Sequence, residues 1–78
     1  MKFEWDQVKN RLNKAKHGIS FALAARVFAV PRRIERYDQG HSGAEDRWIT
    51  IGMVYPAILV VIYTERQNGK CFRLISAR

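Results

Sequence analysis

The sequence predicts an α+β fold in which two N-terminal helices pack on a small antiparallel sheet, in the order β-α-α-β-β-β. Two turn signals, Asn68-Gly69 and the weaker Tyr55-Pro56, divide the stretch from Arg47 to Arg78 into three strand-like runs. Asn and Gly tolerate the positive φ angles of a type I′ hairpin turn. Upstream, Gln7 to His17 consists of good helix formers. At 78 residues, one domain with one small core is expected.

The N-terminal part of the chain has the signals of a strand followed by a helix. Lys2 to Trp5 is expected to be a short strand, and Asp6 is expected to cap the helix Gln7 to His17. Gly18 ends this helix as a residue that accepts a left-handed conformation. An apolar stripe on it is formed by Val8, Leu12 and Ala15.

A second, almost wholly apolar helix is predicted from Phe21 to Phe28, with Ser20 as its cap and Pro31 beyond its end. Its composition predicts burial on most sides. Arg32 to Tyr37 is expected to be a short extended segment, and residues 38–43 a polar loop.

Counting outward from the two turns gives a register for the last three strands. The first turn places Val54 opposite Ala57, and the second places Thr64 opposite Arg73. The same count sets Ile62 opposite Ile75 and Val60 opposite Ala77. One face then carries only aliphatic and thioether side chains and is expected to take the helices: Ile49, Ile51, Met53, Ile58, Val60 and Ile62. The opposite face would carry Trp48, Thr50, Gly52, Leu59, Val61, Tyr63, Leu74, Ser76 and Arg78.

The register also predicts a row of Arg47, Thr64 and Arg73 at one end of the aliphatic face, with Arg66 and Cys71 as the next pair. Adjacent strands lie about 4.8 Å apart, so two arginine stems roughly 10 Å apart could both reach one phosphate.

The composition limits which binding partners and which kinds of catalytic site are expected. Fourteen Lys and Arg against seven Asp and Glu give a formal charge of +7, which favours a polyanion or an acidic protein as partner. The single cysteine, Cys71, excludes an intrachain disulfide and a multi-cysteine zinc site, and fits a buried residue in a reducing, cytoplasmic protein. The longest apolar run, Ala57 to Tyr63, is too short for a bilayer span. No nucleotide-binding, serine-nucleophile or metal-ligand motif is present, so no cofactor and no metal are expected.

Five segments in order, FEWD, KHGISFALAARVF, RWITIGMV, VVIYTER and ISAR, resemble a BrnT-type toxin of the BrnT/BrnA toxin–antitoxin systems over nearly the whole chain. The resemblance implies a single RelE-like domain over residues 1–78 that acts as a metal-independent ribonuclease and arrests translation. It also implies a ribbon-helix-helix antitoxin, BrnA, that neutralises the toxin and represses the shared operon, so that operator DNA is contacted only through the antitoxin.

Two departures from the family pattern are visible. Members usually carry an Xaa-Gly pair where this chain has Tyr55-Pro56, and they usually continue past ISAR into a basic C-terminal helix, whereas this sequence ends at Arg78. Activity would be weakened if that helix carried catalytic or antitoxin-binding groups.

Metal-free RNA cleavage needs a base for the 2′-hydroxyl, cations for the phosphorane and an acid for the leaving 5′-oxygen. Arginine suits the second role, and histidine, which titrates near neutral pH, suits proton transfer. The candidate catalytic residues are His17, Arg47, Tyr63, Arg66, Arg73 and Arg78, and the candidate RNA-binding residues are Lys9, Lys14, Lys16 and Trp48. His41, in a Gly/Ser loop, is a weaker candidate.

Each candidate also has a structural interpretation. The arginines could be solvated or paired with Glu45, Asp46 and Glu65, His17 could cap its helix, and Tyr63 and Trp48 could be packed aromatics. The alternative functions are a non-catalytic basic module that binds nucleic acid or protein, and an interaction subunit whose apolar sheet face docks an antitoxin.

Overall fold

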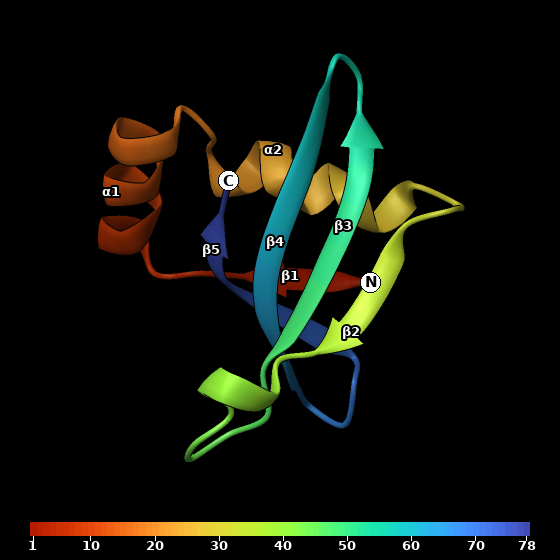
Figure 1. Cartoon of the computed structure of the whole chain (residues 1–78). Coiled ribbons are helices and arrows are strands. Elements are labelled where there is room, and N and C mark those ends of the chain that lie inside the picture. Colours follow the sequence, from red (N-terminus) through yellow and green to blue (C-terminus); the bar gives the residue numbers. More distant parts are fainter.

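The computed structural model describes residues 1–78 and has the predicted α+β class (Figure 1). The elements in chain order are β1 (Lys2–Glu4), α1 (Gln7–His17), α2 (Phe21–Ala24), the 3₁₀ helix η1 (Ala25–Ala29), β2 (Ile34–Tyr37), the 3₁₀ helix η2 (Gln39–His41), β3 (Trp48–Val54), β4 (Ala57–Arg66) and β5 (Cys71–Ala77). Both helices lie in the N-terminal half, as predicted. None of the helices is long and apolar enough to cross a membrane.

The sheet has five strands in the order β1-β5-β4-β3-β2. The prediction of a wholly antiparallel sheet is wrong at one edge, because β1 runs parallel to β5 with Phe3 opposite Phe72. The extended segment before the polar loop becomes β2, which pairs with β3 and forms the other edge. The chain therefore crosses the sheet through the helical segment between its two edge strands.

The helix boundaries follow the predicted caps. The Asp6 carboxylate accepts hydrogen bonds from the backbone N–H groups of Val8 and Lys9, and Gly18 ends α1 with φ of 75°. Ser20 Oγ accepts from Leu23 N at 3.1 Å at the start of α2. The second helix is shorter as an α-helix than expected, because it tightens into η1 after Ala24.

The apolar stripe of α1 is not what holds this helix. Val8 and Leu12 are 55% and 64% exposed, and Asn13 is the one buried residue of α1. The Asn13 amide donates from Nδ2 to Ile19 O and Ala77 O at 2.9 and 2.8 Å, and its Oδ1 accepts from Ala77 N at 3.1 Å. A polar clamp on the end of β5 therefore replaces the expected apolar contact.

The predicted β3–β4 register is confirmed from Val54 opposite Ala57 to Ile49 opposite Ile62, but the predicted pair of Arg47 and Thr64 lies beyond the ladder, because β3 begins at Trp48. In the second turn Asn68 and Gly69 have φ of 56° and 82°, as a type I′ turn requires, and Gln67 is also left-handed. The β4–β5 register is correct only near this turn, where Thr64 lies opposite Arg73.

A bulge then shifts the β4–β5 ladder between Ile62 and Tyr63, so that Ile62 lies opposite Ser76 and Val61 opposite Ala77. The two predicted pairs Ile62–Ile75 and Val60–Ala77 are therefore wrong. A bulge inserts one extra residue into a strand and redirects the side chains that follow.

The assignment of the two sheet faces is reversed. The helical layer covers the face that carries Leu59, Val61 and Tyr63, and Phe21, Ala24 and Val27 complete this core. Gly52 permits the close approach, because a Cβ atom there would lie 2.8 Å from Val27 Cγ2. Sheet side chains at this contact must be small for η1 to pack so closely.

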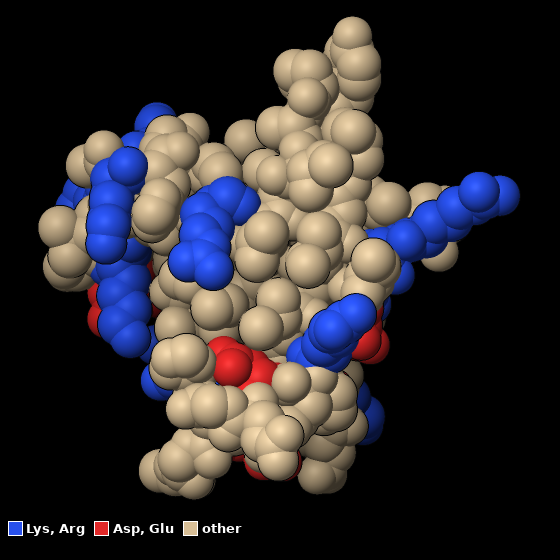
Figure 2. All heavy atoms as spheres, viewed as in Figure 1, with Lys and Arg blue, Asp and Glu red and all other residues tan.

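The face expected to take the helices is open instead. We call the surface formed by Ile49, Ile51, Met53, Ile58, Val60 and Ile62 the open aliphatic face; Met53 and Ile58 are 50% and 61% exposed, and the other four are partly buried. Figure 1 views the sheet from this side, with α2 behind β4. Figure 2 shows the middle of the same side free of charged side chains, with Lys and Arg around it and Asp or Glu atoms at its lower edge.

Candidate functional site

The loop that joins β2 to β3 is closed at its base by hydrogen bonds among Asp38, Ser42 and Arg47. Asp38 N donates to Arg47 O at 2.8 Å, and Ser42 Oγ accepts from Arg47 N at 2.9 Å while lying 2.6 Å from Asp38 O and 3.4 Å from Arg47 O. Because Ser42 links both ends of the loop, the intervening η2 turn has a fixed position relative to Arg47.

Within this loop, His41 and Asp38 form a pair. His41 Nδ1 lies 3.1 Å from Asp38 Oδ1, and the aspartate side chain is 9% exposed while the imidazole is 73% exposed. A carboxylate on Nδ1 fixes the proton there and leaves Nε2 unprotonated in the neutral ring, as in catalytic triads. The exposed Nε2 is then available to accept a proton.

Two arginines join this pair on the open side of the sheet. Arg47 and Arg78 line one hollow of about 240 Å³ together with Asp38 and His41, and Ile49, Ile62, Ile75 and Ser76 complete its wall. The β5 bulge is what brings Arg78 here: Arg78 N and O bond to Val60 O and N at 2.9 and 2.6 Å. The prediction that Arg78 lies on the Trp48 side is therefore wrong.

A second hollow adjoins the first along β5. Ile75 and Ser76 line both, and the second continues over α1 to Lys9, Leu12, Asn13, Lys16 and His17. We call these two hollows together the cationic groove. Four Lys or Arg side chains and two histidines line it, against a single carboxylate, Asp38, which already contacts His41. Such a groove attracts a chain of phosphates.

Two of the predicted arginines lie elsewhere and are paired. Arg66 Nη2 lies 3.0 Å from Glu45 Oε2, and Arg73 Nη1 lies 2.7 Å from Glu4 Oε2. The hydrogen bond from Arg73 lowers the pKa of Glu4, and Cys71 also donates to this carboxylate. In the predicted arginine–threonine–arginine row, Arg73 is therefore already paired with a carboxylate, and Arg47 lies in a different hollow.

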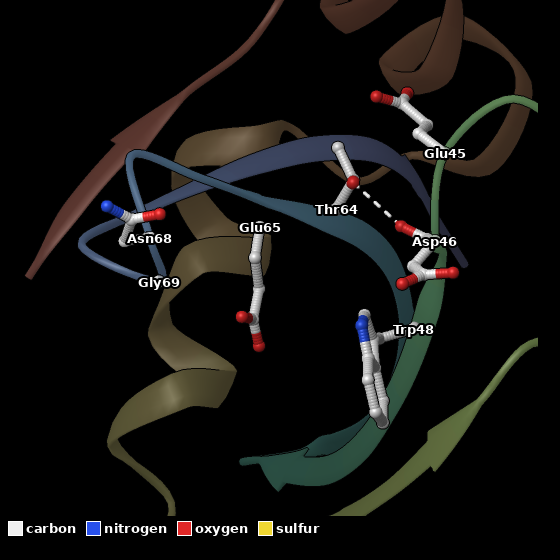
Figure 3. A pocket seen from close by; sticks show the side chains of 7 residues that line it. All are labelled: Glu45, Asp46, Trp48, Thr64, Glu65, Asn68 and Gly69. Carbon is white, nitrogen blue, oxygen red and sulfur yellow. Dashed lines mark hydrogen bonds between the residues drawn. The ribbon is translucent and has the colours of Figure 1, made fainter.

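Thr64, the middle of that row, is 2% exposed and donates to Asp46 O at 2.7 Å. Figure 3 shows this bond beside a third hollow of about 350 Å³, which also contains Trp48 and the carboxylates of Glu45 and Glu65. No Lys or Arg lines this hollow. The acidic lining of this hollow disfavours phosphate. Trp48 lines this hollow and not the cationic groove.

Tyr63 is part of the core. Its ring is 0% exposed and packs edge-on against Phe28 at 4.9 Å between centroids, and its hydroxyl donates to the Glu35 carboxylate. Burial, and then this hydrogen bond, raises the pKa of Tyr63, and the same bond, with help from Arg33, lowers the pKa of Glu35. Such a phenol neither stacks on a base nor readily gives up its proton.

Of the ten candidate site residues, five line the cationic groove: Arg47 and Arg78 in its first hollow, and Lys9, Lys16 and His17 in its second. Lys14 is exposed on α1 but does not line the groove. Sequence reasoning missed Asp38 and gave His41 too little weight. The spacing Asp-Xaa-Xaa-His within a loop that also contains Ser42 is the signal that could have found this pair.

The residues do not assemble a metal-ligand set: no three His, Cys, Asp or Glu side chains come together. The groups that the cationic groove does offer are two histidines for proton transfer and guanidinium and ammonium groups for phosphate oxygens.

Comparison with known proteins gives one match. The family model described as "Ribonuclease toxin, BrnT, of type II toxin-antitoxin system" matches residues 5–78. Among curated proteins, none matched the sequence.

Proposed function

Because the chain belongs to the BrnT family of ribonuclease toxins from type II toxin–antitoxin systems, we propose that it cleaves RNA endonucleolytically in the cationic groove, without a metal ion. The observation that carries this proposal is that Arg47, Arg78 and the His41–Asp38 pair line one hollow on the open side of the sheet. Cleavage of messages in the cytoplasm would arrest translation, and a BrnA-type antitoxin would neutralise the toxin and carry it to operator DNA. The arrangement of helices and sheet is proposed to be RelE-like.

In the proposed reaction, His41 Nε2 takes the proton of a ribose 2′-hydroxyl, and the resulting oxyanion attacks the adjacent phosphorus. Asp38 holds the imidazole in the required tautomer and stabilises the imidazolium that forms. Arg47 and Arg78 neutralise the charge that develops on the phosphorane oxygens. The products are a 2′,3′-cyclic phosphate and a fragment with a free 5′-hydroxyl.

The other histidine, His17, lines the second hollow of the groove and not the one that contains His41, Arg47 and Arg78, so it is assigned no proton transfer at that phosphate. Water would protonate the leaving 5′-oxygen. Lys9 and Lys16 line the same hollow as His17 and would hold the phosphates on the leaving side.

The test is cleavage of single-stranded RNA in excess EDTA by the wild type and by two matched variants, His41→Asn and His17→Asn. The wild type is expected to cleave and His41→Asn to lose roughly 10²–10⁴-fold in rate, which is the usual contribution of a general base, whereas His17→Asn should lose less than about tenfold. Binding to an uncleavable 2′-deoxy oligonucleotide, read by fluorescence anisotropy, should change by less than about threefold for His41→Asn, because the proposed phosphate contacts are Arg47 and Arg78.

A substrate with a good leaving group tests whether His41 acts as the base. Uridine 3′-(p-nitrophenyl phosphate) needs no acid, so it should not restore the rate of His41→Asn. Cleavage that appears only when a divalent metal is restored, or a His41→Asn variant as active as the wild type, would overturn the mechanism. Salt-sensitive RNA binding with no cleavage would indicate a non-catalytic binding module.

A further inference from the structure

The open aliphatic face is larger than its six residues suggest. On β2, Ile34 lies opposite Ile51 and is 53% exposed, and on α1, Leu12 is 64% exposed in the hollow that also contains Ile75. A continuous apolar surface of this kind on a small soluble domain marks a site of contact with another molecule. The side chains of the open aliphatic face indicate which class of molecule binds there.

RNA is a poor occupant of this surface. Proteins bind unpaired bases mainly by stacking them on aromatic rings or on guanidinium planes. The open aliphatic face has neither: its six side chains are isoleucine, valine and methionine. The aromatic residues of the sheet lie on the other face, where Trp48 and Tyr63 belong to the core or pack against it.

A second copy of the chain is also a poor occupant. Ile49 and Ile62 belong both to this face and to the hollow that contains Arg47 and Arg78, so a molecule that covers the face reaches the two arginines. Neither arginine has a carboxylate partner within this chain, and a second copy brings its own net charge of +7. Burying cations without counter-charges is costly.

We propose that the open aliphatic face docks an amphipathic, acidic segment of the cognate antitoxin, with its aliphatic residues on β3 and β4 and its carboxylates on Arg47 and Arg78. The identity of the partner rests on the proposed function, since a toxin of a type II system has an antitoxin. Burial of the apolar surface supplies most of the contact area with the antitoxin segment, and the two arginines fix the orientation of the segment through its carboxylates.

Docking of this kind would neutralise the toxin without a conformational change in it. Ile49 and Ile62, which line the hollow with Arg47 and Arg78, are part of the docked surface, and the carboxylates of the antitoxin segment would occupy the positions that RNA phosphates need. Antitoxin and RNA therefore compete for Arg47 and Arg78, while the far end of the open aliphatic face, at Met53 and Ile58, is used by the antitoxin alone.

That far end supplies the test. Met53 and Ile58 are cross-strand partners, so the double variant Met53→Lys/Ile58→Glu removes apolar surface while an opposite-charge pair supports the hairpin. The matched control places the same two side chains on the helical layer, at two exposed positions, as Ala22→Glu/Ala29→Lys. Thermal unfolding and circular dichroism check that both variants fold.

Purified cognate antitoxin is titrated into each protein by calorimetry. The Met53→Lys/Ile58→Glu variant should raise the dissociation constant at least about tenfold, the size of effect typical of losing anchor residues from an interface. The control should stay within about twofold of the wild type. RNA cleavage in the absence of antitoxin should be unchanged in both variants, because none of the four positions lines the cationic groove.

Three results would overturn the proposal. The first is an antitoxin affinity that the Met53→Lys/Ile58→Glu variant leaves unchanged. The second is an equal loss of RNA binding in this variant, which would make the face part of the RNA site. The third is sedimentation of the wild type as a dimer and of the Met53→Lys/Ile58→Glu variant as a monomer, with the same antitoxin affinity in both. That result would make a second copy of the chain the occupant of the face. A toxin that cleaves no RNA would contradict the proposed function alone, because calorimetry reads antitoxin binding directly.

Discussion

Replacing Tyr63 by Phe separates a structural role of this residue from a catalytic one. The substitution keeps the buried ring between Phe28 and Phe72 and removes only the hydroxyl that donates to Glu35. A hydrogen bond to a charged acceptor contributes about 1.5–3 kcal/mol. Glu35 is 43% exposed and keeps Arg33 at 2.9 Å, so water and Arg33 replace part of the loss. We expect Tyr63→Phe to destabilise the fold by about 1–2 kcal/mol.

The assay is urea and thermal unfolding at neutral pH, together with RNA cleavage. For a domain of this size, 1 kcal/mol corresponds to about 4–8 °C, so the midpoint should fall by about 4–16 °C. Cleavage well below the midpoint should stay within about twofold of the wild type, because the phenol touches no group of the cationic groove.

Acidic pH should reduce the difference in stability between the wild type and the Tyr63→Phe variant. The Tyr63 hydroxyl lowers the pKa of Glu35 from its ordinary value of 4.5. A carboxyl with a lowered folded-state pKa stabilises the fold above its unfolded-state pKa, and this contribution is lost as pH falls through the folded-state pKa. The stability gap should therefore be complete at neutral pH and narrow below about pH 4. Equal stability at pH 7, or a loss of cleavage greater than about tenfold in a folded variant, would refute this reasoning.

Two further predictions concern how the fold holds the site. Gly52→Ala would place a Cβ atom 2.8 Å from Val27 Cγ2 and 3.3 Å from Arg33 Cβ, and it should cost about 1–3 kcal/mol by urea unfolding. A double-mutant cycle with Val27→Ala should show the two changes to be non-additive, and strict additivity would contradict the close contact. Asn13→Ala should cost about 2–4 kcal/mol, because it leaves the backbone groups of Ala77 without their partner. Amide exchange at Ala77 should quicken, and an unchanged exchange rate there would argue against the clamp.

The turn residues made much of the sheet predictable. Tyr55-Pro56 and Asn68-Gly69 fix where two hairpins reverse, and cross-strand pairing then follows by counting as far as the first irregularity. No glycine or proline marks the bulge near Ile62, so counting continued past it. The resulting one-residue error in the β4–β5 register is why Arg78 is predicted on the wrong face of the sheet.

Alternation alone could not decide which face the helices cover. Both faces of β3 and β4 are largely apolar, and hydrophobicity alone favours the more aliphatic one as the core. Close packing was the stronger requirement: Gly52 leaves room for η1, whereas the Ile51 and Met53 side chains on the other face leave none. The acidic partners of Arg66 and Arg73 come from the loop before β3 and from β1, and no local pattern links these segments.

The position of His41, the proposed catalytic base, also depends on distant contacts. His41 follows Asp38 by three residues, but a Gly/Ser-containing loop offers no reason to place it in a groove. Ser42 closes the loop and the bulge brings Arg78, and together these features place His41 beside two arginines. Both depend on hydrogen bonds that only the folded chain reveals.

The most direct test of this account compares two double variants with the same chemical change. In excess EDTA, Arg47→Ala/Arg78→Ala should lose at least roughly 10³-fold in RNA cleavage, since removing a single oxyanion donor already costs about 10²–10³. Arg66→Ala/Arg73→Ala removes as many charges but only arginines already paired with Glu45 and Glu4, and it should stay within about threefold of the wild type. Equal losses in the two variants, or a greater loss for Arg66→Ala/Arg73→Ala, would contradict the assignment of the cationic groove as the site of cleavage.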